Sequence, residues 1–386
     1  MDSSNRAVSK VVLSTFDEAA ISRAAKGCHE SLGAKADLVV AFVTPDFQPR
    51  LEEFVELVQV FAQAPRVVGC SASGVIGTAE ENEGVSGFSL LALSLPRTGI
   101  EVTLVREAAS SPVPPSLDDE DPAAIALFHP WRFDPQNWLR RWNATFPAVP
   151  VIGGLASGGS SEQEIFLFTE AGATDAAGLM VRFRGGVRIE ALVSQGCRPI
   201  GRAEPITEAR DNYVSRLGGD PAYSVLKEAV EGLMNEGAEI VPGSIHAGLA
   251  VSEYIEELRR GDFLVRNLLG ADAESGRVHI GASVEIGRTL QFQFRDRDTA
   301  DEDLRSQCGA LRDAGGSGPF AALLFSCGGR GQHFFGVPNH DAGILAEAFG
   351  RHPMAGFFCN GEIGPVGVAN YLHGYTASAA LFYAAD

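Results

Sequence analysis

A short motif with two glycines five residues apart occurs three times along the chain. Each copy follows a helical pattern that separates it from an earlier apolar run, so the local order is strand, helix, glycine-bearing strand and further strand. A small polar residue precedes the second glycine of every copy: Ser73, Ser157 and Asn360. The glycine pairs are Gly69 and Gly74, Gly153 and Gly158, and Gly356 and Gly361. This recurrence predicts an α/β (mixed α+β) fold, in which degenerate strand-helix-strand units build extended sheets covered by helices.

Apolar runs and helical spacing predict the individual elements. Ser14 or Thr15 is expected to cap the first helix, and the T-x-x-E sequence Thr299–Glu302 to open a helix that ends at Arg312. Runs of strand length predict strands at 8–16, 37–44, 88–95, 124–129, 165–168, 179–183, 263–270, 288–295, 320–327 and 371–382. Helical spacing predicts helices at 17–31, 51–63, 135–145, 221–234 and 341–349.

The length of the chain predicts more than one domain. At 386 residues it exceeds the usual size of a single domain, which is about 100 to 200 residues. The sequence Gly218-Gly219-Asp220 stands before a predicted helix that has proline in its first turn. We therefore expect two related domains, residues 1–220 and residues 221–386.

The charge balance and the cysteines restrict the partners and the compartment. The chain has 31 basic and 49 acidic residues, and its formal charge of −18 repels polyphosphates and anionic lipid. Nucleic acid and membrane insertion are therefore not expected. The N-terminal residues carry no export signal, and the six cysteines lie far apart without a C-x-x-C pair. Free thiols of this kind are typical of a reducing, cytoplasmic location.

Several familiar catalytic and cofactor motifs are absent from the sequence. The glycine pairs imitate part of a phosphate loop, but Val75, Gly159 and Glu362 stand where the lysine belongs. The sequence around Ser71 misses the nucleophile elbow by one residue. The histidines form neither an H-E-x-x-H motif nor a zinc spacing with cysteine. We therefore expect no cofactor and no metal.

Reactive side chains near the glycine motifs have two interpretations each. Cys70, Cys327 and Cys359 lie near comparable strand ends, so each is a conceivable nucleophile if a histidine such as His373 lies close by. Small buried cysteines are the simpler interpretation. Glu362 is either a general acid or base, or a carboxylate that binds exposed N–H groups beside the glycines.

Three further polar sites are candidates for ligand contact. Arg266 and Asn267 lie in an otherwise apolar strand, where the guanidinium is expected to fix either a ligand carboxylate or a structural acid. Arg330 follows a buried strand, and it is either a ligand contact or an exposed loop charge. Tyr375 and His373 are expected on one side of the last strand, as pocket wall or as core.

Six segments, taken together in this order, resemble the FIST family, the F-box and intracellular signal transduction proteins. The resemblance extends from about residue 10 to the end and covers an N-terminal and a C-terminal FIST domain. The six segments are V67-V-G-C-S-A-S-G-V-I-G77, V193-S-Q-G-C-R-P-I-G201, F263-L-V-R-N-L-L-G270, L324-F-S-C-G-G-R-G331, A355-G-F-F-C-N-G-E-I-G-P-V-G367 and H373-G-Y-T-A-S-A379.

The resemblance implies a cytoplasmic sensory protein of signal transduction that binds a small ligand, amino acids among the candidates, without catalysis. Its output is expected to pass to a separate signalling protein. The acidic surface favours a cationic, zwitterionic or neutral ligand, although Arg266 with Arg330 would suit a carboxylate. The residues expected to contact the ligand are Ser71, Ser73, Ser157, Arg266, Asn267, Cys327, Arg330, Cys359, Asn360, Glu362 and Tyr375.

Two alternatives to a ligand sensor stay open at this point. The chain is an interaction scaffold if an exposed face recruits a protein partner and the pocket has no ligand. A hydrolase or acyl transferase that uses Cys359, Cys327 or Ser71 is the enzymatic alternative.

Overall fold

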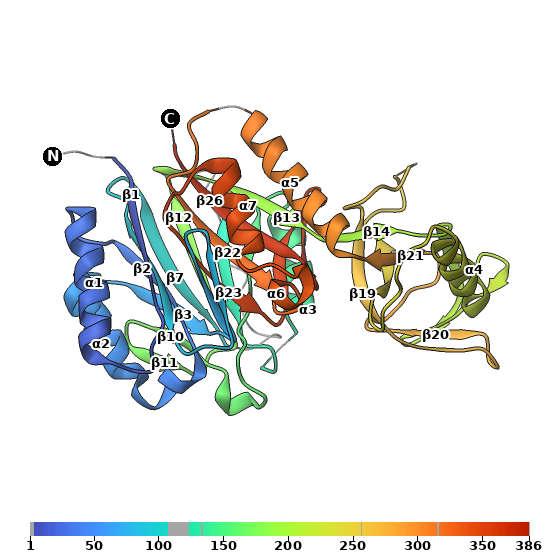
Figure 1. The fold of residues 1–386 in the computed structure, drawn as a ribbon, viewed down its shortest axis with the longest axis horizontal. Helices are drawn as coiled ribbons and strands as arrows, with labels where there is room; N and C mark the ends of the chain where they lie inside the picture. Colours follow the sequence, from blue (N-terminus) through green and yellow to red (C-terminus); the bar gives the residue numbers. More distant parts are fainter. Residues whose placement is uncertain (1–3, 107–122, 133, 256, 315, 386) are drawn as a thin grey trace. The chain divides into compact units, whose positions relative to one another are not determined.

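The computed structural model describes residues 4–106, 123–132, 134–255, 257–314 and 316–385 (Figure 1). Contacts divide the chain into two compact units. The first unit comprises Met1–Val193 and Leu304–Asp386, and the second comprises Ser194–Asp303. The boundary expected near residue 220 falls within the second unit and stays a prediction about sequence domains, which need not coincide with units defined by contacts.

The described residues of the first unit form three sheets of six strands each. In order, the first sheet is β1 (Arg6–Val12), β6 (Phe88–Ser94), β2 (Leu38–Val43), β3 (Val67–Ser71), β10 (Leu167–Thr169) and β11 (Gly172–Thr174). The second is β25 (Ala369–His373), β24 (Glu362–Val366), β9 (Val151–Leu155), β8 (Ala124–Phe128), β12 (Gly178–Arg184) and β7 (Gly99–Val105). The third is β13 (Val187–Ser194), β26 (Ala377–Ala384), β22 (Ala321–Cys327), β23 (Met354–Cys359), β4 (Gly74–Gly77) and β5 (Glu80–Glu83).

Each sheet is built around one parallel pair of strands that a helix connects. The parallel pairs are β2 with β3, β8 with β9, and β22 with β23. The connecting helices are α2 (Leu51–Ala62), α3 (Pro135–Thr145) and α7 (His340–Phe349), the last preceded by the short α6 (Gly331–Phe335). The 3₁₀ turns Pro45–Arg50 and Glu162–Glu164 complete the connections. This recurrence confirms the predicted α/β fold made of strand-helix-strand units.

The three sheets exchange hairpins in a cycle. The hairpin β4–β5 follows β3 in sequence but pairs with β23 of the third sheet. The hairpin β10–β11 follows β9 and pairs with β3 of the first sheet, and β24–β25 follows β23 and pairs with β9 of the second. Each sheet is therefore completed by a hairpin from another part of the chain.

The first glycine of each motif allows the parallel strands to approach closely. A Cβ atom on Gly69, Gly153 or Gly356 would lie 1.9, 1.8 or 2.0 Å from a carbonyl oxygen of the adjacent parallel strand. Real Cβ atoms do not tolerate such distances, so the recurrence of glycine has a steric cause.

Side chains alternate between a shared core and the covering helices. Residues such as Phe42, Leu127 and Phe325 belong to one core formed by all three sheets. Phe42 stacks on Phe357 of the third sheet with ring centroids 4.7 Å apart. The opposite face of the first sheet packs against α1 (Glu18–Leu32) and α2, and that of the second sheet packs against α3. The opposite face of the third sheet packs against α5 (Arg297–Asp313) and α7 (Figure 1). The continuous apolar runs follow from burial on both faces.

The second unit is an antiparallel sheet with one helix, inserted in sequence between β13 and α5. Its helix α4 (Ala222–Asn235) packs against β16 and β20. The strands are β14 (Cys197–Pro199), β15 (Glu204–Arg210), β16 (Tyr213–Leu217), β17 (Asp220–Pro221), β18 (Ile245–Ala250), β19 (Phe263–Asp272), β20 (Arg277–Ile280) and β21 (Thr289–Arg295).

Three local predictions were wrong. Asp17, and not Ser14 or Thr15, caps α1 by accepting a hydrogen bond from Ala20 N–H. Helix α5 begins before the predicted capping box, and Asp296 accepts from Thr299 N–H at 2.8 Å. The predicted strand 371–382 is two strands, because Tyr375 adopts a φ of 62° in the turn between them.

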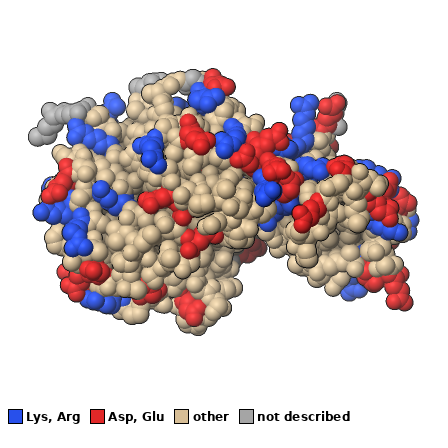
Figure 2. All heavy atoms as spheres, viewed as in Figure 1, with Lys and Arg blue, Asp and Glu red and all other residues tan. Residues whose placement is uncertain are grey.

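Figure 2 shows acidic and basic side chains interspersed over the drawn face of the first unit. Among the described residues, no helix combines the length and the hydrophobicity that crossing a bilayer requires.

Candidate functional site

The strand ends of β3, β9 and β23 meet in the first unit, and hydrogen bonds join the segments that follow them. Ser157 is the centre of this network, since its Oγ donates to Phe358 O and accepts from Ser73 N–H at 2.9 Å. Asn360 donates from its backbone to Leu155 O and from its side chain to Ala156 O, both at 3.1 Å. The structure therefore brings together the three small polar residues that precede the second glycines.

These residues differ in exposure. Ser73 and Asn360 are exposed, whereas Ser157 is fully buried. Ser71 is also fully buried, and its Oγ accepts from Phe166 N–H at 3.2 Å. The strand ends thus have an exposed polar rim above a buried, hydrogen-bonded layer.

Glu362 occupies a position that is apolar in the other two sheets. In the second sheet it pairs with Gly154, directly after the close-approach glycine of β9. The same register position holds Leu167 in the first sheet and Val75 in the third, and both belong to the shared core. A carboxyl group therefore replaces a core aliphatic side chain at one of three equivalent positions.

The carboxyl group of Glu362 is only partly satisfied by protein donors. Its Oε2 accepts from Thr376 N–H at 3.1 Å, and its side chain is fully buried. Its Oε1 is buried and has no N–H or O–H donor among the described residues. Burial raises the pKa of Glu362 well above its usual value, although Thr376 N–H, the charge of Arg330 and a hydrogen bond from the thiol of Cys327 oppose this shift. A thiol is a weak donor, so the buried carboxyl is poorly satisfied unless something else binds it.

Arg330 and Asp341 form a buried ion pair beside this carboxyl. Nε and Nη2 of Arg330 donate to Oδ2 and Oδ1 of Asp341 at 2.7 and 2.9 Å, and neither side chain is exposed to a meaningful degree. Ser326 Oγ donates to Oδ2 at 2.8 Å, and His340 Nδ1 lies 2.9 Å from Oδ1. Burial acts to raise the pKa of Asp341, but Arg330 and His340 hold it well below its usual range. The interpretation of Arg330 as an exposed loop charge is wrong, because its guanidinium is needed to compensate Asp341.

A third carboxyl reaches the same ion pair from the hairpin β4–β5. Glu81 accepts from Ala342 N–H at 2.8 Å, at the N-terminus of α7. Burial, together with the nearby charge of Asp341, raises the pKa of Glu81 to about 8, and Arg330 opposes this shift. Arg330 therefore interacts electrostatically with Glu81 as well as with Glu362.

The cysteines of the site have the properties of buried core residues. Cys327 and Cys359 are neighbours in register on β22 and β23, with Cys327 half-buried and Cys359 buried. Burial raises the pKa of both Cys70 and Cys359 well above the usual thiol value. This shift disfavours the thiolate that a nucleophilic mechanism requires. His373 Nε2 lies 3.0 Å from Gly364 O.

The other residues predicted to contact the ligand are Tyr375, Arg266 and Asn267. Tyr375 O accepts from Arg330 Nη1 at 3.4 Å, and its φ of 62° excludes the expected alternation with His373 along one strand. Arg266 and Asn267 belong to β19 of the second unit. Burial lowers the pKa of Arg266 to about 10, and its Nη1 donates to Val265 O at 2.8 Å.

Sequence reasoning missed Asp341, Glu81 and Thr376. Asp341 stands in the first turn of a predicted helix, where an acid is ordinarily a surface residue that favours the helix dipole. Nothing in the sequence around Glu81 indicates its role, because that role depends on a hairpin that pairs with a sheet formed by residues far away along the chain. In the described part of the chain, no three histidine, cysteine or acidic side chains are placed to hold a metal ion.

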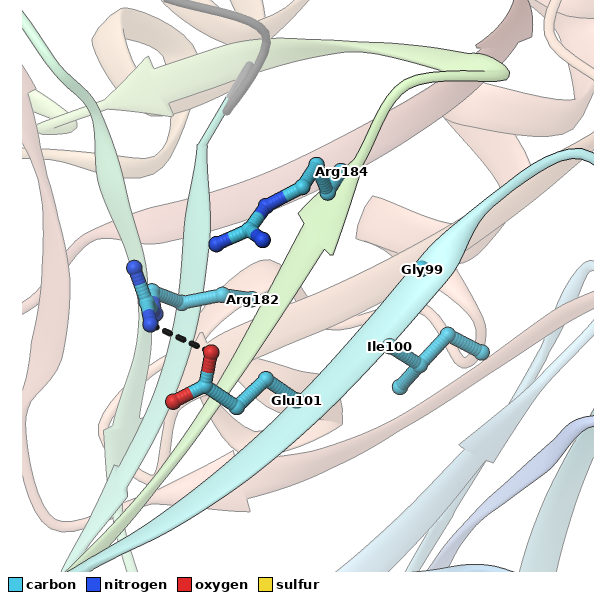
Figure 3. A pocket seen from close by; sticks show the side chains of 5 residues that line it. All are labelled: Gly99, Ile100, Glu101, Arg182 and Arg184. Carbon is cyan, nitrogen blue, oxygen red and sulfur yellow. Dashed lines mark hydrogen bonds and ion pairs between the residues drawn. The ribbon is translucent and has the colours of Figure 1, made fainter. Parts of the chain in front are cut away.

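A separate hollow of about 230 Å³ lies beside strands β7 and β12 (Figure 3). Its lining consists of Gly99, Ile100, Glu101, Arg182 and Arg184. Arg182 Nη2 donates to Glu101 Oε2, so the buried guanidinium already has a carboxylate partner.

Comparison with known proteins identifies both halves of the chain. The sequence model of the FIST N domain matches residues 37–220, and that of the FIST C domain matches residues 222–365. An uncharacterized protein of Mycobacterium tuberculosis (strain H37Rv) is 34% identical over 367 residues, which are 94% of this chain and 96% of that protein. An uncharacterized protein of Mycobacterium bovis is 34% identical over 370 residues, 95% of each chain.

One further relative matches a smaller part of the chain, and one solved structure aligns over most of the chain with low similarity. An F-box/LRR-repeat protein of Arabidopsis thaliana is 31% identical over 116 residues, which are 25% of this chain and 21% of that protein. The solved structure of cyanuric acid hydrolase from A. caulinodans aligns with 98% of this chain and 100% of its own, at a TM-score of 0.27 and 10% identity. That likeness is too low to carry an argument.

Proposed function

The chain belongs to the FIST family, and from this premise we propose that it is a cytoplasmic sensory protein that binds a small polar metabolite where β3, β9 and β23 end. FIST domains are sensory domains of signal transduction. Amino acids and related metabolites are the ligand class that we propose, without catalysis. The output passes to a separate signalling protein.

One observation carries the proposal. Oε1 of Glu362 is buried and lacks an N–H or O–H donor among the described residues, at a register position where the two equivalent residues are aliphatic. A buried acceptor of this kind costs about 1 to 3 kcal/mol when it stays unsatisfied. A ligand that donates a hydrogen bond there would recover this free energy on binding.

The surroundings of Glu362 suit recognition rather than nucleophilic chemistry. The strand ends contribute segments from three sheets, so a molecule bound there would contact parts of the chain that are distant in sequence. Burial keeps the nearby Cys359 in its thiol form. Binding would therefore stabilise the arrangement of the strand ends, which a partner protein would then detect.

A thermal-shift screen tests the proposal. The wild-type protein is heated with each member of a metabolite library at millimolar concentration, and a rise in Tm is expected for at least one amino acid or related compound. The same compounds are then tested on Glu362→Gln and on Glu56→Gln, which changes an exposed carboxyl of α2. We expect Glu56→Gln to keep the shift and Glu362→Gln to lose most of it. The absence of any shift across the library in the wild-type protein would reject ligand sensing.

A further inference from the structure

The buried site contains more acidic than basic groups. Three carboxyl groups, those of Glu81, Asp341 and Glu362, interact with the single guanidinium of Arg330. Two hydrogen bonds commit this guanidinium to Asp341. The positive charge that is left to balance Glu362 is therefore small.

Among the described residues, Arg330 supplies the positive charge that acts on Glu362, and the other groups that face Glu362 are two thiols, an imidazole and a backbone N–H. Arg330 approaches from the start of α6, and the thiols of Cys327 and Cys359 approach from β22 and β23. His373 lies directly opposite Glu362 on β25 and is buried, with Nε2 3.0 Å from Gly364 O. Thr376 contributes a backbone N–H to Oε2.

On the basis of the proposed function, we propose that the ligand carries a protonated amine, and that this ammonium group docks on Oε1 of Glu362 in exchange for the carboxyl proton. The reaction is Glu362–COOH + R–NH₃⁺ → Glu362–COO⁻···⁺H₃N–R + H⁺. One O–H bond breaks, its electron pair stays on the carboxylate, and the proton goes to solvent, so that atoms and charge balance.

An ammonium group satisfies the site better than other donors. It supplies Oε1 with an N–H donor, which it lacks among the described residues, and it supplies the positive charge that an ionised Glu362 needs. A hydroxyl or amide donor supplies the hydrogen bond without the charge, so it would leave Glu362 protonated. An additional carboxylate at this place would be repelled by the acidic groups.

The proton exchange has a measurable pH dependence. Burial raises the pKa of Glu362, so the free protein holds this proton above the pH at which an exposed glutamate would lose it. Ammonium binding requires the ionised carboxylate. Below the pKa of Glu362, the affinity is therefore expected to rise by up to about tenfold for each unit by which the pH is increased. This holds as long as the probe amine stays protonated.

The experiment compares amines with their hydroxyl analogues. The probes are the twenty protein L-amino acids with the corresponding 2-hydroxy acids, and simple primary amines from ethanolamine to spermidine with the corresponding alcohols. Thermal shift ranks all probes on the full-length protein. Isothermal titration calorimetry then measures each binding amine in phosphate and in HEPES, neither of which contains a primary amine, because the difference in observed enthalpy reports the protons released.

We expect at least one amine to bind, its hydroxyl analogue to bind at least tenfold more weakly, and protons to be released when the amine binds at a pH below the pKa of Glu362. In Glu362→Gln the affinity for the amine should fall at least tenfold and the proton release should disappear. The wild-type proton count tests the inference even if this variant folds poorly. Equal binding of the hydroxyl analogue, or amine binding without proton release, would overturn the ammonium inference and leave ligand sensing intact. Failure of every probe to bind would instead count against ligand sensing itself.

Discussion

The most informative stability experiment replaces Glu362 by glutamine and follows unfolding as a function of pH. Glutamine has the same shape, and its carbonyl oxygen can still accept the hydrogen bond from Thr376 N–H that Oε2 now accepts at 3.1 Å. The substitution removes only the titrating proton. Differences between the two proteins therefore report the ionisation of this one buried group.

The sign follows from the direction of the pKa shift. An unfolded glutamate titrates near the ordinary value of 4.5, whereas burial raises the pKa of folded Glu362 well above it. Between these two values the folded protein holds a proton that the unfolded chain has lost, so the stabilising contribution is complete below about pH 4.5 and declines as the pH rises. One proton corresponds to a slope of about 1.4 kcal/mol per pH unit. From pH 5 to pH 7 the wild-type protein should lose up to about 3 kcal/mol relative to Glu362→Gln.

The assay is urea denaturation at pH 5, 6, 7 and 8, with the exposed variant Glu56→Gln as the control. The difference in unfolding free energy between the wild-type protein and Glu362→Gln should become steadily less favourable to the wild type as the pH rises. The control should differ from the wild type by a constant amount. A pH-independent difference for Glu362→Gln would refute the reasoning, because it would mean that Glu362 has an ordinary pKa in the folded protein.

The remaining predictions concern the ion pair and the glycines. Asp341→Asn leaves the guanidinium of Arg330 buried without its countercharge, so urea denaturation should show a loss of about 3 to 5 kcal/mol; a loss below about 1 kcal/mol would contradict the geometry. Gly153→Ala places a Cβ 1.8 Å from a carbonyl oxygen and should cost on the order of 3 kcal/mol or more. Gly232→Ala lies in α4, where the new Cβ would meet nothing within 4 Å apart from its chain neighbours and the helix's own backbone, and should stabilise by about 0.5 to 1 kcal/mol in the same assay. Equal effects of the two glycine substitutions would show that close strand approach is not the reason for Gly153.

Much of the architecture was predictable because it depends on local patterns. The parallel pairs produce continuous apolar runs, since both of their faces are covered, and the run 124–129 matches β8 closely. The glycine recurrence was also visible, and its cause is local to each pair: the carbonyl group of the neighbouring strand occupies the space of a Cβ. Polar side chains at equivalent strand ends therefore allowed Ser73, Ser157 and Asn360 to be placed together.

The sequence pattern does not indicate which sheet each hairpin joins. Val75 pairs with Phe357, although the two residues are far apart along the chain, and nothing in the composition of β4 specifies this partner. The role of Glu81 depends on that pairing, since the exchanged hairpin brings its carboxyl to the N-terminus of α7. The left-handed φ of Tyr375 was missed for a similar reason, because a tyrosine rarely adopts it without tertiary support.

The most direct test of ligand sensing at Glu362 is a high-resolution crystal structure of the protein purified from cells without added ligands. We predict unassigned density of a small molecule with a donor atom about 3 Å from Oε1 of Glu362, close to the segments that contain Ser157 and Asn360. Density for water alone at Oε1, in crystals grown at neutral pH and again after soaking with the compounds that bind best in the thermal-shift screen, would contradict the account.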